Sequence, residues 1–355
     1  MNTNEKMLSL GAESCGCFSY FNKKEFFNSE QFGDLLDDEN FEKYSKGIIN
    51  YLRNKPLPQK VLIDLHPVYK SSELGEKLGK RWQIPTIKIQ HHLAHIHAVA
   101  SENKLKNFIG LALDGTGLGF DGHIWGGEVF EIKAGKHKRL ASLEEQILIG
   151  SDMAVYEPAR VLLSVLANFL NKNQVYKYLK KIYTANEFEL LYNQRQERFN
   201  CQLASSTGRI IDAAASLLFG INQRQAKHQA TVFLEKQATT SYRDLEPVIL
   251  KDDQGLYRLQ TTPLFEYLIA NLSKDKKRLA ATVLDYLAQG FMVLVHKTKT
   301  GTGPMVAAGG LSKLKIISNV FTKNKIKLAE KNPAGDCGLA VGQIWAYQNL
   351  TNPGN

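Results

Sequence analysis

Two histidines four residues apart, His91 and His95, have the spacing of a metal-ligand pair. They follow a strand-like run at residues 86–89 and lie at the start of a helix-like run at residues 93–100. On a helix this spacing places both imidazoles on one face, where they can converge on a single cation. Most isolated pairs of this kind are surface residues, so the spacing alone is a weak indication. The next motif along the chain strengthens it.

A glycine-rich acidic run follows the strand-like residues 108–113. It consists of Asp114, Gly115, Thr116 and Gly117. Glycines allow backbone amides to approach a phosphate closely and reach positive φ without a Cβ penalty. Asp114 itself would repel a phosphate unless a cation lay between them. The two motifs together therefore indicate metal-assisted chemistry on a phosphorylated substrate.

Two further glycine turns lie towards the C-terminal end of the sequence. One is Gly309-Gly310, and the other is Gly335, which precedes Asp336. Helices that begin after such turns can stabilise an anion through their dipoles. Glycine is common in turns of every kind, so each of these turns alone is weak evidence for an anion site. Asp336 is better explained by binding of a metal or a hydroxyl than by contact with phosphate.

The elements that must position these residues fall into two similar series. Apolar runs and turn signals predict, in the first series, strands at 7–14 and 15–21, a helix at 39–52, a strand at 61–65, a helix at 72–82 and a strand at 86–89. This order predicts a mixed sheet with helices across its faces.

The pattern then restarts. The second series has strands at 108–113 and 123–132, helical stretches at 158–237 and 264–298, a short strand at 305–308 and a last helix at 339–350. Each series opens with strand, glycine turn and strand. We therefore expect two related lobes that face one cleft, residues 1–104 and 105–355, the second with a mostly helical insertion at about 158–298.

Composition excludes some classes of function. The chain has 355 residues, 43% hydrophobic and 23% charged, and no uninterrupted apolar run approaches the ~18–20 residues that span a bilayer. Its start lacks the apolar region of a signal peptide, so we expect a cytoplasmic protein without a membrane segment. The net charge of +10 comes mostly from lysines spread along the chain. Solvated helix faces explain them better than a nucleic-acid surface does.

The four cysteines, Cys15, Cys17, Cys201 and Cys337, are too few and too scattered for a disulfide framework. Cys15 and Cys17 alternate on the predicted strand at 15–21, so both would face the same side. A shared face permits a metal or redox role. We favour the simpler interpretation that they are two small buried hydrophobic residues.

Several motifs in order give the chain a resemblance to a known family. They are Asp64-Leu65-His66-Pro67 with Tyr69, the histidine motif at 91–95, the run at 113–117, Asp121 to Glu128, Glu157-Pro158 with Arg160, the run at 206–213, Gln229-Ala230 with Leu234-Glu235, Gly309-Gly310, and Asp336 with Gly338 and Gly342-Gln343. The chain resembles the C-terminal transferase region of the HypF carbamoyltransferases, which act in maturation of nickel–iron hydrogenases. That region is related to tRNA threonylcarbamoyltransferases and antibiotic O-carbamoyltransferases.

The resemblance implies an α/β fold with duplicated actin-like (ribonuclease H-like) nucleotide-binding lobes. It also implies roles for individual residues. His91, His95 and Asp336 match the metal ligands, with Asp114 as a fourth; two imidazoles and carboxylate suit zinc or iron equally. Asp212 matches a residue that binds the ribose hydroxyls of a carbamoyl-adenylate, and the loop from Asp114 to Gly117, with Gly309 and Gly310, matches the segments that bind the nucleotide. His92 matches a histidine beside the metal, and His66 lies at a strand end that is expected to face the cleft.

The chain also departs from the family pattern. Where the family has a Lys-Asn pair, this chain has Cys15-Gly16, and where the family has a Glu-Gly pair, it has Lys227-His228. Leu314 replaces an asparagine that contacts the nucleotide, and Cys337 replaces the middle glycine of Asp-Gly-Gly. Leu93 stands in place of a third consecutive histidine, and Ala159 in place of a tryptophan. Losing an asparagine and a glutamate removes hydrogen bonds that select a nucleotide. These departures affect metal binding less than nucleotide binding.

The favoured hypothesis is a metal-dependent carbamoyltransferase, with Asp114, His92 and His66 as candidate catalytic residues. It would move a carbamoyl group from carbamoyl-adenylate to a cysteine thiol of a HypE-like partner. Nothing in the sequence matches the activating regions of full-length relatives, so a separate carbamoyl-adenylate-forming protein is expected to supply the donor. Two alternatives stay open: a degenerate, non-catalytic paralogue that binds metal or nucleotide, and a tRNA threonylcarbamoylation-type protein.

Overall fold

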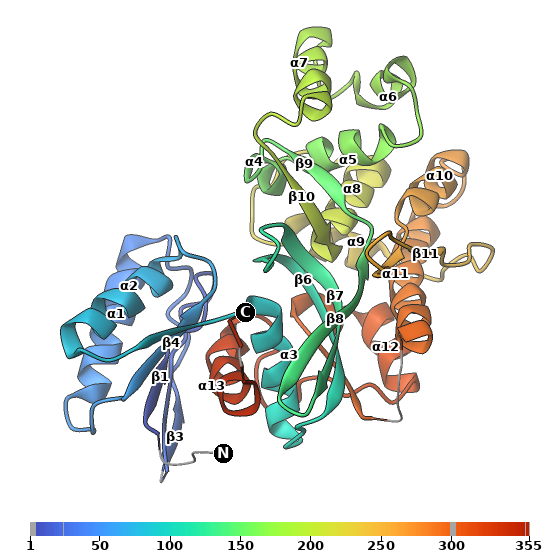
Figure 1. Ribbon diagram of the computed structural model, residues 1–355. Coiled ribbons are helices and arrows are strands. Elements are labelled where there is room, and N and C mark those ends of the chain that lie inside the picture. Colours follow the sequence, from blue (N-terminus) through green and yellow to red (C-terminus); the bar gives the residue numbers. More distant parts are fainter. Residues whose placement is uncertain (1–4, 24, 299–302, 352, 355) are drawn as a thin grey trace.

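A computed structural model describes residues 5–23, 25–298, 303–351 and 353–354. Two mixed β-sheets form the framework, and two helices lie between them (Figure 1). These central helices are α3 (His91–Glu102) and α13 (Leu339–Asn349), which pack against each other. The α/β architecture with two sheet-centred lobes confirms the fold class predicted from the sequence.

The first sheet has five strands in the order β3-β2-β1-β4-β5. Its elements are β1 (Met7–Ser9), β2 (Ser19–Asn22), β3 (Glu25–Asn28), α1 (Asp38–Leu52), β4 (Lys60–Asp64), α2 (Lys70–Trp82) and β5 (Thr86–Ile89). Strand β1 pairs antiparallel with β2 and parallel with β4. Alternate residues of the strands reach opposite faces. Leu8, Val61 and Ile63 therefore join the core that includes residues of α1 and α2, whereas Met7 and Leu62 join the core that includes residues of α3 and α13.

The second sheet has eight strands. Its strands are β6 (Phe108–Leu118), β7 (Ile124–Lys133), β8 (Lys136–Leu143), β9 (Gln146–Ile149), β10 (Cys201–Ser206), β11 (Ile249–Lys251), β12 (Tyr257–Leu259) and β13 (Met305–Ala308). Strand β6 lies between β7, its antiparallel partner, and β13, its parallel partner. Helix α3 packs on β6 and β13, so the histidine helix rests directly on this sheet.

The remaining helices surround the far part of the second sheet (Figure 1). They are α4 (Met153–Tyr156), α5 (Pro158–Leu166), α6 (Lys172–Leu179), α7 (Ala185–Gln196), α8 (Thr207–Phe219), α9 (Gln229–Gln237), α10 (Thr262–Ala270), α11 (Lys276–Thr298) and α12 (Lys315–Lys323). Among the helices described, α11 alone is long and apolar enough to cross a membrane, but 78% of its most apolar window is buried inside the protein. It is the central helix of the larger core.

Local structure differs from the predictions at two places. The segment at about 158–298 is mostly helical as expected, but β10 interrupts the helical stretch predicted at 158–237, β11 and β12 lie between the two predicted stretches, and all three strands join the second sheet. These strands have three to six residues and are held by pairing with distant partners, which local patterns do not reveal. The strand expected at 15–21 begins only at Ser19. Gly11 and Gly16 have φ of 62° and 54°, which breaks the extended chain before it.

Close helix packing joins the two lobes. A Cβ on Gly342 of α13 would lie 1.9 Å from the backbone oxygen of Ala94 on α3, so glycine is required at this crossing. The next residue, Gln343, is fully buried and binds the first sheet's turn through Oε1, which accepts from Ser9 Oγ at 2.5 Å and from Gly11 N at 3.0 Å. Helix α13 thereby fixes the turn after β1 relative to α3.

Candidate metal and nucleotide site

Helix α3 begins directly after β5, and its first turn carries the histidines. Gln90 caps the helix: its side-chain oxygen accepts from the backbone N–H of Leu93 at 2.9 Å, which satisfies one of the free donors of the first turn. His91 and His95 then lie one turn apart, with ring centroids 4.8 Å apart. Both are about 99% buried, so their imidazoles face protein groups and not bulk solvent.

The acidic glycine run lies on a bulged strand and not in a free turn as predicted. Strand β6 continues through it to Leu118, and its pairing shifts between Leu113, opposite Gly127, and Gly117, opposite Trp125. Three residues of β6, Asp114, Gly115 and Thr116, therefore face one residue of β7. A bulge of this kind re-aims side chains while the ladder continues on both sides. A Cβ on Gly117 would lie 2.6 Å from His92 and 2.9 Å from His91, so glycine allows β6 to approach α3.

The structure brings His91, His95, Asp114 and Asp336 to one point. One donor atom from each lies within 4.8 Å of the others. His91 Nε2 is 3.3 Å from Asp114 Oδ2, and His95 Nε2 is 3.4 Å from Asp336 Oδ1. The crossed distances, from His91 to Asp336 and from His95 to Asp114, are both 3.8 Å. Two imidazole nitrogens and two carboxylates thus surround a common space.

The electrostatics of this cluster suit a cation. Nε2 of His91 and of His95 is buried without a hydrogen-bond partner. Burial alone would lower the pKa of His91, but Asp64 and Asp114 together raise it well above its usual range. Burial alone would raise the pKa of Asp114, but His91 and His95 lower it well below its usual range. Burial opposes ionisation of His95 and Asp336 in the same way, yet the pKa of His95 is raised and that of Asp336 lowered. The donor set and the unpartnered nitrogens fit a divalent metal ion.

A carboxylate that the sequence interpretation did not assign a role orients His91. Asp64, at the end of β4, places Oδ2 2.7 Å from His91 Nδ1. A carboxylate on the second ring nitrogen fixes the tautomer in which Nε2 is free to bind a metal, as in many histidine metal sites. The sequence signal was present, because Asp64 is an acid at the end of a buried strand and belongs to the motif that includes His66.

The other two candidate histidines lie beside the cluster. His66 contacts it indirectly: its backbone N–H donates to Asp64 Oδ1 at 2.9 Å, and its ring stacks on Tyr69 with centroids 4.2 Å apart. His92 is fully buried, and Gln90 Nε2 lies 2.9 Å from its Nδ1. Burial and the neighbouring His91 hold the pKa of His92 well below its usual range, so this imidazole is neutral.

A cavity of about 220 Å³ extends from the cluster towards α8. Its lining includes Asp114 and Gly115 of the β6 bulge, Arg209 and Asp212 of α8, and Arg224 and His228. Asp212 is 96% buried and lies 2.7 Å from Arg209 Nη2, while Arg209 Nε and Nη1 are buried without partners. Burial raises the pKa of Asp212, although Arg209 partly offsets the effect. The cavity therefore offers a carboxylate for hydroxyl groups and free guanidinium donors for an anion.

The glycine turn after β13 completes the cavity wall. Gly310 and Leu314 line it, and Gly309 has φ of 87°. A Cβ on Gly309 would lie 2.1 Å from the backbone oxygen of Leu113, so only glycine fits where the turn crosses β6. Lys227 does not face this cavity: its Nζ donates to the Ser14 backbone oxygen at 2.7 Å and lies 3.0 Å from Asp34 Oδ2.

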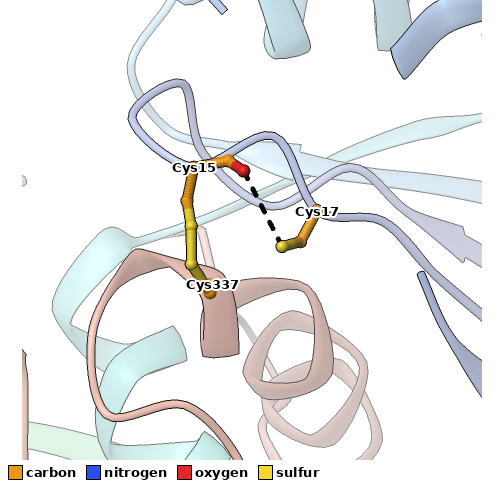
Figure 2. Close-up of side chains that lie close together, drawn as sticks. All are labelled: Cys15, Cys17 and Cys337. Atoms are coloured by element: carbon orange, nitrogen blue, oxygen red, sulfur yellow. Dashed lines mark hydrogen bonds between the residues drawn. A yellow bond between two sulfur atoms is a disulfide. The ribbon is translucent and has the colours of Figure 1, made fainter. Parts of the chain in front are cut away.

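The cysteines were interpreted incorrectly. Cys15 and Cys337, 322 residues apart, form a disulfide that links the turn after β1 to the segment carrying Asp336 (Figure 2). The prediction of two small buried residues holds for Cys17, whose pKa burial raises to about 11, with a contribution from Asp336. The pairing depends on the approach of two lobes, so no spacing in the sequence revealed it.

Known proteins similar to this chain match it along nearly its whole length. A family model described as "Carbamoyltransferase, Kae1-like Domain, second subdomain" matches residues 110–343, and one described as "HypF Kae1-like domain" matches residues 2–102. A carbamoyltransferase HypF homolog of Cupriavidus necator is 30% identical over 332 residues, covering 88% of this chain and 84% of that protein. The probable carbamoyltransferase HypF of Methanocaldococcus jannaschii is 31% identical over 366 residues, covering 98% of this chain and 47% of that protein.

Solved structures agree. The crystal structure of full-length HypF in the phosphate- and nucleotide-bound form superposes with a TM-score of 0.89 at 25% identity, covering 97% of this chain and 55% of that one. The HypF of T. kodakarensis gives a TM-score of 0.88 at 26% identity, covering 99% and 49%. The chain thus spans about half the length of most of these relatives. The resemblance inferred from the motifs is confirmed, and the chain belongs to the HypF carbamoyltransferase family.

Proposed function

We propose that this protein transfers a carbamoyl group from carbamoyl-adenylate to a cysteine thiol of a HypE-like partner during nickel–iron hydrogenase maturation in the cytoplasm. One observation carries the proposal. The four-residue cluster at the end of α3 adjoins, through Asp114, the cavity that contains Asp212 and Arg209. The proposed cation site and the proposed nucleotide site therefore share Asp114. Transfer breaks the bond between the carbamoyl carbon and the phosphate oxygen, so the two sites must lie side by side.

His91, His95, Asp114 and Asp336 would hold a divalent metal ion, zinc or iron, and the ion would act as a Lewis acid on an oxygen of the donor. Asp64 keeps His91 in the tautomer that such a ligand needs. The buried, neutral His92 beside His91 adds no positive charge that would weaken cation binding. The chain's own contribution at this end is thus orientation and exclusion of water.

The cavity would bind the adenylate. Asp212 is placed to accept hydrogen bonds from ribose hydroxyls, and the free nitrogens of Arg209 supply donors for an anionic group. Gly115 on the β6 bulge and Gly310 after β13 line this cavity. We assign the neighbouring residues Thr116, Gly117 and Gly309 to the same nucleotide-binding loops. A cavity of about 220 Å³ holds part of a nucleotide, so the rest of the donor would extend towards the metal cluster.

The transfer itself needs no nucleophile from this chain. The partner's thiolate attacks the carbamoyl carbon, the bond from that carbon to the phosphate oxygen breaks, and AMP leaves with the electron pair. Positioning of donor and acceptor would supply much of the rate. His66, stacked on Tyr69 after β4, donates its backbone N–H to Asp64, the residue that orients His91, and we assign its ring the role of receiving or holding a proton there.

The test is a reconstituted transfer reaction. It combines the protein with a separate carbamoyl-adenylate-forming protein, carbamoyl phosphate, ATP and the HypE-like acceptor, and the acceptor is then weighed by mass spectrometry. We expect a carbamoyl adduct with the natural chain and none with Asp114→Ala. No adduct from the natural chain, in a mixture where an intact family member does modify the acceptor, would contradict transfer and favour a non-catalytic binding protein.

The lobes at 1–104 and 105–355 are proposed to work as one unit in this reaction.

A further inference from the structure

Three cysteines meet at the border between the lobes, beside the histidine cluster but separate from it. Cys15 and Cys17 lie in the turn between β1 and β2, and Cys337 lies in the short 3-10 helix η2 (Asp336–Gly338). Their three sulfur atoms lie within 4.8 Å of one another. Figure 2 shows the Cys17 side chain beside the Cys15–Cys337 disulfide, with its thiol directed to the Cys15 backbone oxygen at 3.8 Å.

Both pieces of backbone that carry these cysteines are held in place. Cys15 O accepts from the backbone N–H of Gly33 at 3.3 Å, and Gly16 O accepts from that of Phe32 at 3.0 Å. On the other side, Gly338 N donates to Gly335 O at 2.9 Å. Each of the two cysteine-bearing segments is thus held by backbone hydrogen bonds as well as by the disulfide, and breaking the disulfide would not by itself remove these backbone contacts.

We propose that the three cysteines, when reduced, form a thiolate site for a thiophilic divalent cation such as Zn²⁺, and that the Cys15–Cys337 disulfide is its oxidised, metal-free form. Soft sulfur ligands select such cations. Zinc–sulfur bonds of about 2.3 Å in a tetrahedral site place ligand sulfurs about 3.8 Å apart. All three sulfurs lie within 4.8 Å of one another, and after reduction those of Cys15 and Cys337 would separate from bonding distance to that spacing. Three protein ligands leave the fourth position of the ion open.

The two states are connected by balanced chemistry. A dithiol reductant attacks one sulfur of the disulfide, and a second exchange releases the oxidised dithiol and leaves Cys15 and Cys337 as thiols. Binding of the cation then displaces the thiol protons, including that of the buried Cys17. In the cytoplasm proposed above, thiols are normally kept reduced, so the metal-binding form would be the resting one.

The site differs chemically from the histidine cluster yet is mechanically joined to it. The cluster offers nitrogen and oxygen, whereas the cysteine site offers only sulfur. Asp336, one of the cluster's carboxylates, is the residue before Cys337, and its Oδ2 accepts a hydrogen bond from Ser14, the residue before Cys15. Either the disulfide or a bound ion would hold these two segments together beside the histidines.

The experiment uses Co²⁺ as a spectroscopic probe. Cobalt bound by thiolates gives strong sulfur-to-metal charge-transfer absorption in the near ultraviolet, which histidine and carboxylate ligands do not give. We expect this band in the natural chain treated with a dithiol, and we expect it to be absent from the oxidised chain. Zinc content after dialysis, measured by elemental analysis, should likewise be higher by about one ion per chain in the reduced form.

Variants identify the ligands. Cys17→Ser keeps the disulfide partners, so its oxidised form should fold as the natural chain does, and its reduced form should lose the band. Cys201→Ser changes a cysteine outside the cluster and should keep it. His91→Ala with His95→Ala should also keep it, because these residues belong to the other site. A reduced natural chain without the band, or a band that persists in Cys17→Ser, would overturn the proposal.

Discussion

The two halves of the candidate site are built differently. At the histidine cluster, every charged group faces an opposite charge within 4 Å, and Asp64 behind it fixes His91. At the cavity beside it, Asp212 pairs with Arg209; Arg224 and His228 also line the wall, and the Arg209 guanidinium keeps two unpartnered nitrogens. The charges of the first half face one another, whereas the second half keeps guanidinium donors that no protein group accepts from.

This difference indicates what each half selects. A preformed set of converging ligands binds an ion without ordering cost, so metal affinity should depend steeply on each ligand. The cavity has an apolar residue, Leu314, where the family pattern has an asparagine, so shape would contribute more to nucleotide binding than hydrogen bonds do. A donor delivered by a partner at high local concentration needs less intrinsic affinity.

Loss of both histidines should have the largest effect. We expect the double variant His91→Ala, His95→Ala to lose more than about 100-fold in metal affinity. Loss of a residue that only hydrogen-bonds to a metal ligand lowers metal affinity by about 10–100-fold, and loss of two direct ligands should lower it further. Elemental analysis after dialysis measures it. Asp64→Asn, which alters only the outer partner, should fall in the smaller range, and His137→Ala on β8 should change nothing. Equal metal content in the natural chain and the double variant would refute the metal assignment.

The framework that holds the histidine helix should be nearly as sensitive. Gly342→Ala places a Cβ against the Ala94 backbone oxygen, which cannot move without shifting α3. We expect a loss of about 2–3 kcal/mol in the free energy of unfolding, the range for overpacked cores, measured by urea denaturation. Gly303→Ala is the matched control, because a Cβ there meets nothing within 4 Å. A Gly342→Ala chain as stable as the control would show that the two central helices are loosely packed.

At the cavity, Asp212→Asn should have an intermediate effect. The amide keeps the shape but removes the charge that pairs with Arg209 and accepts from a ribose. We expect about tenfold weaker binding of a non-hydrolysable adenylate analogue, since a hydrogen bond involving a charged group is worth about 1.5–3 kcal/mol. Calorimetry measures it, with Asp285→Asn on α11 as the control. Unchanged affinity would mean that Asp212 serves only to pair with Arg209.

The sequence predicted what is local and what the family resemblance supplied. Apolar runs located β5 and β13 with their observed bounds, and i,i+4 spacing placed His91 and His95 on one face. Strands β10 to β12 were missed because their stability comes from distant partners. Asp336 was connected to the histidines only through the resemblance, since it lies more than two hundred residues away in the sequence. The Cys15–Cys337 contact joins residues 322 positions apart and had no local signal in the sequence, so the folded structure revealed it.

The smallest effect, and the sharpest test of the contrast, concerns Leu314. We expect the natural chain to bind AMP only in the high-micromolar range or more weakly, about −5 kcal/mol, and Leu314→Asn to tighten binding by up to about tenfold. The backbone favours the change, because Leu314 caps α12 with φ −55° and ψ 131°, a position that asparagine prefers.

An asparagine at this position has two possible partners, and calorimetry combined with thermal unfolding separates them. If the new amide contacts the nucleotide, affinity rises while the melting temperature changes little. If the melting temperature rises and affinity does not, the amide has capped α12, and Leu314 does not limit nucleotide binding. Tight AMP binding by the natural chain would contradict the contrast itself, because the donors left free on Arg209 would then compensate for the apolar wall.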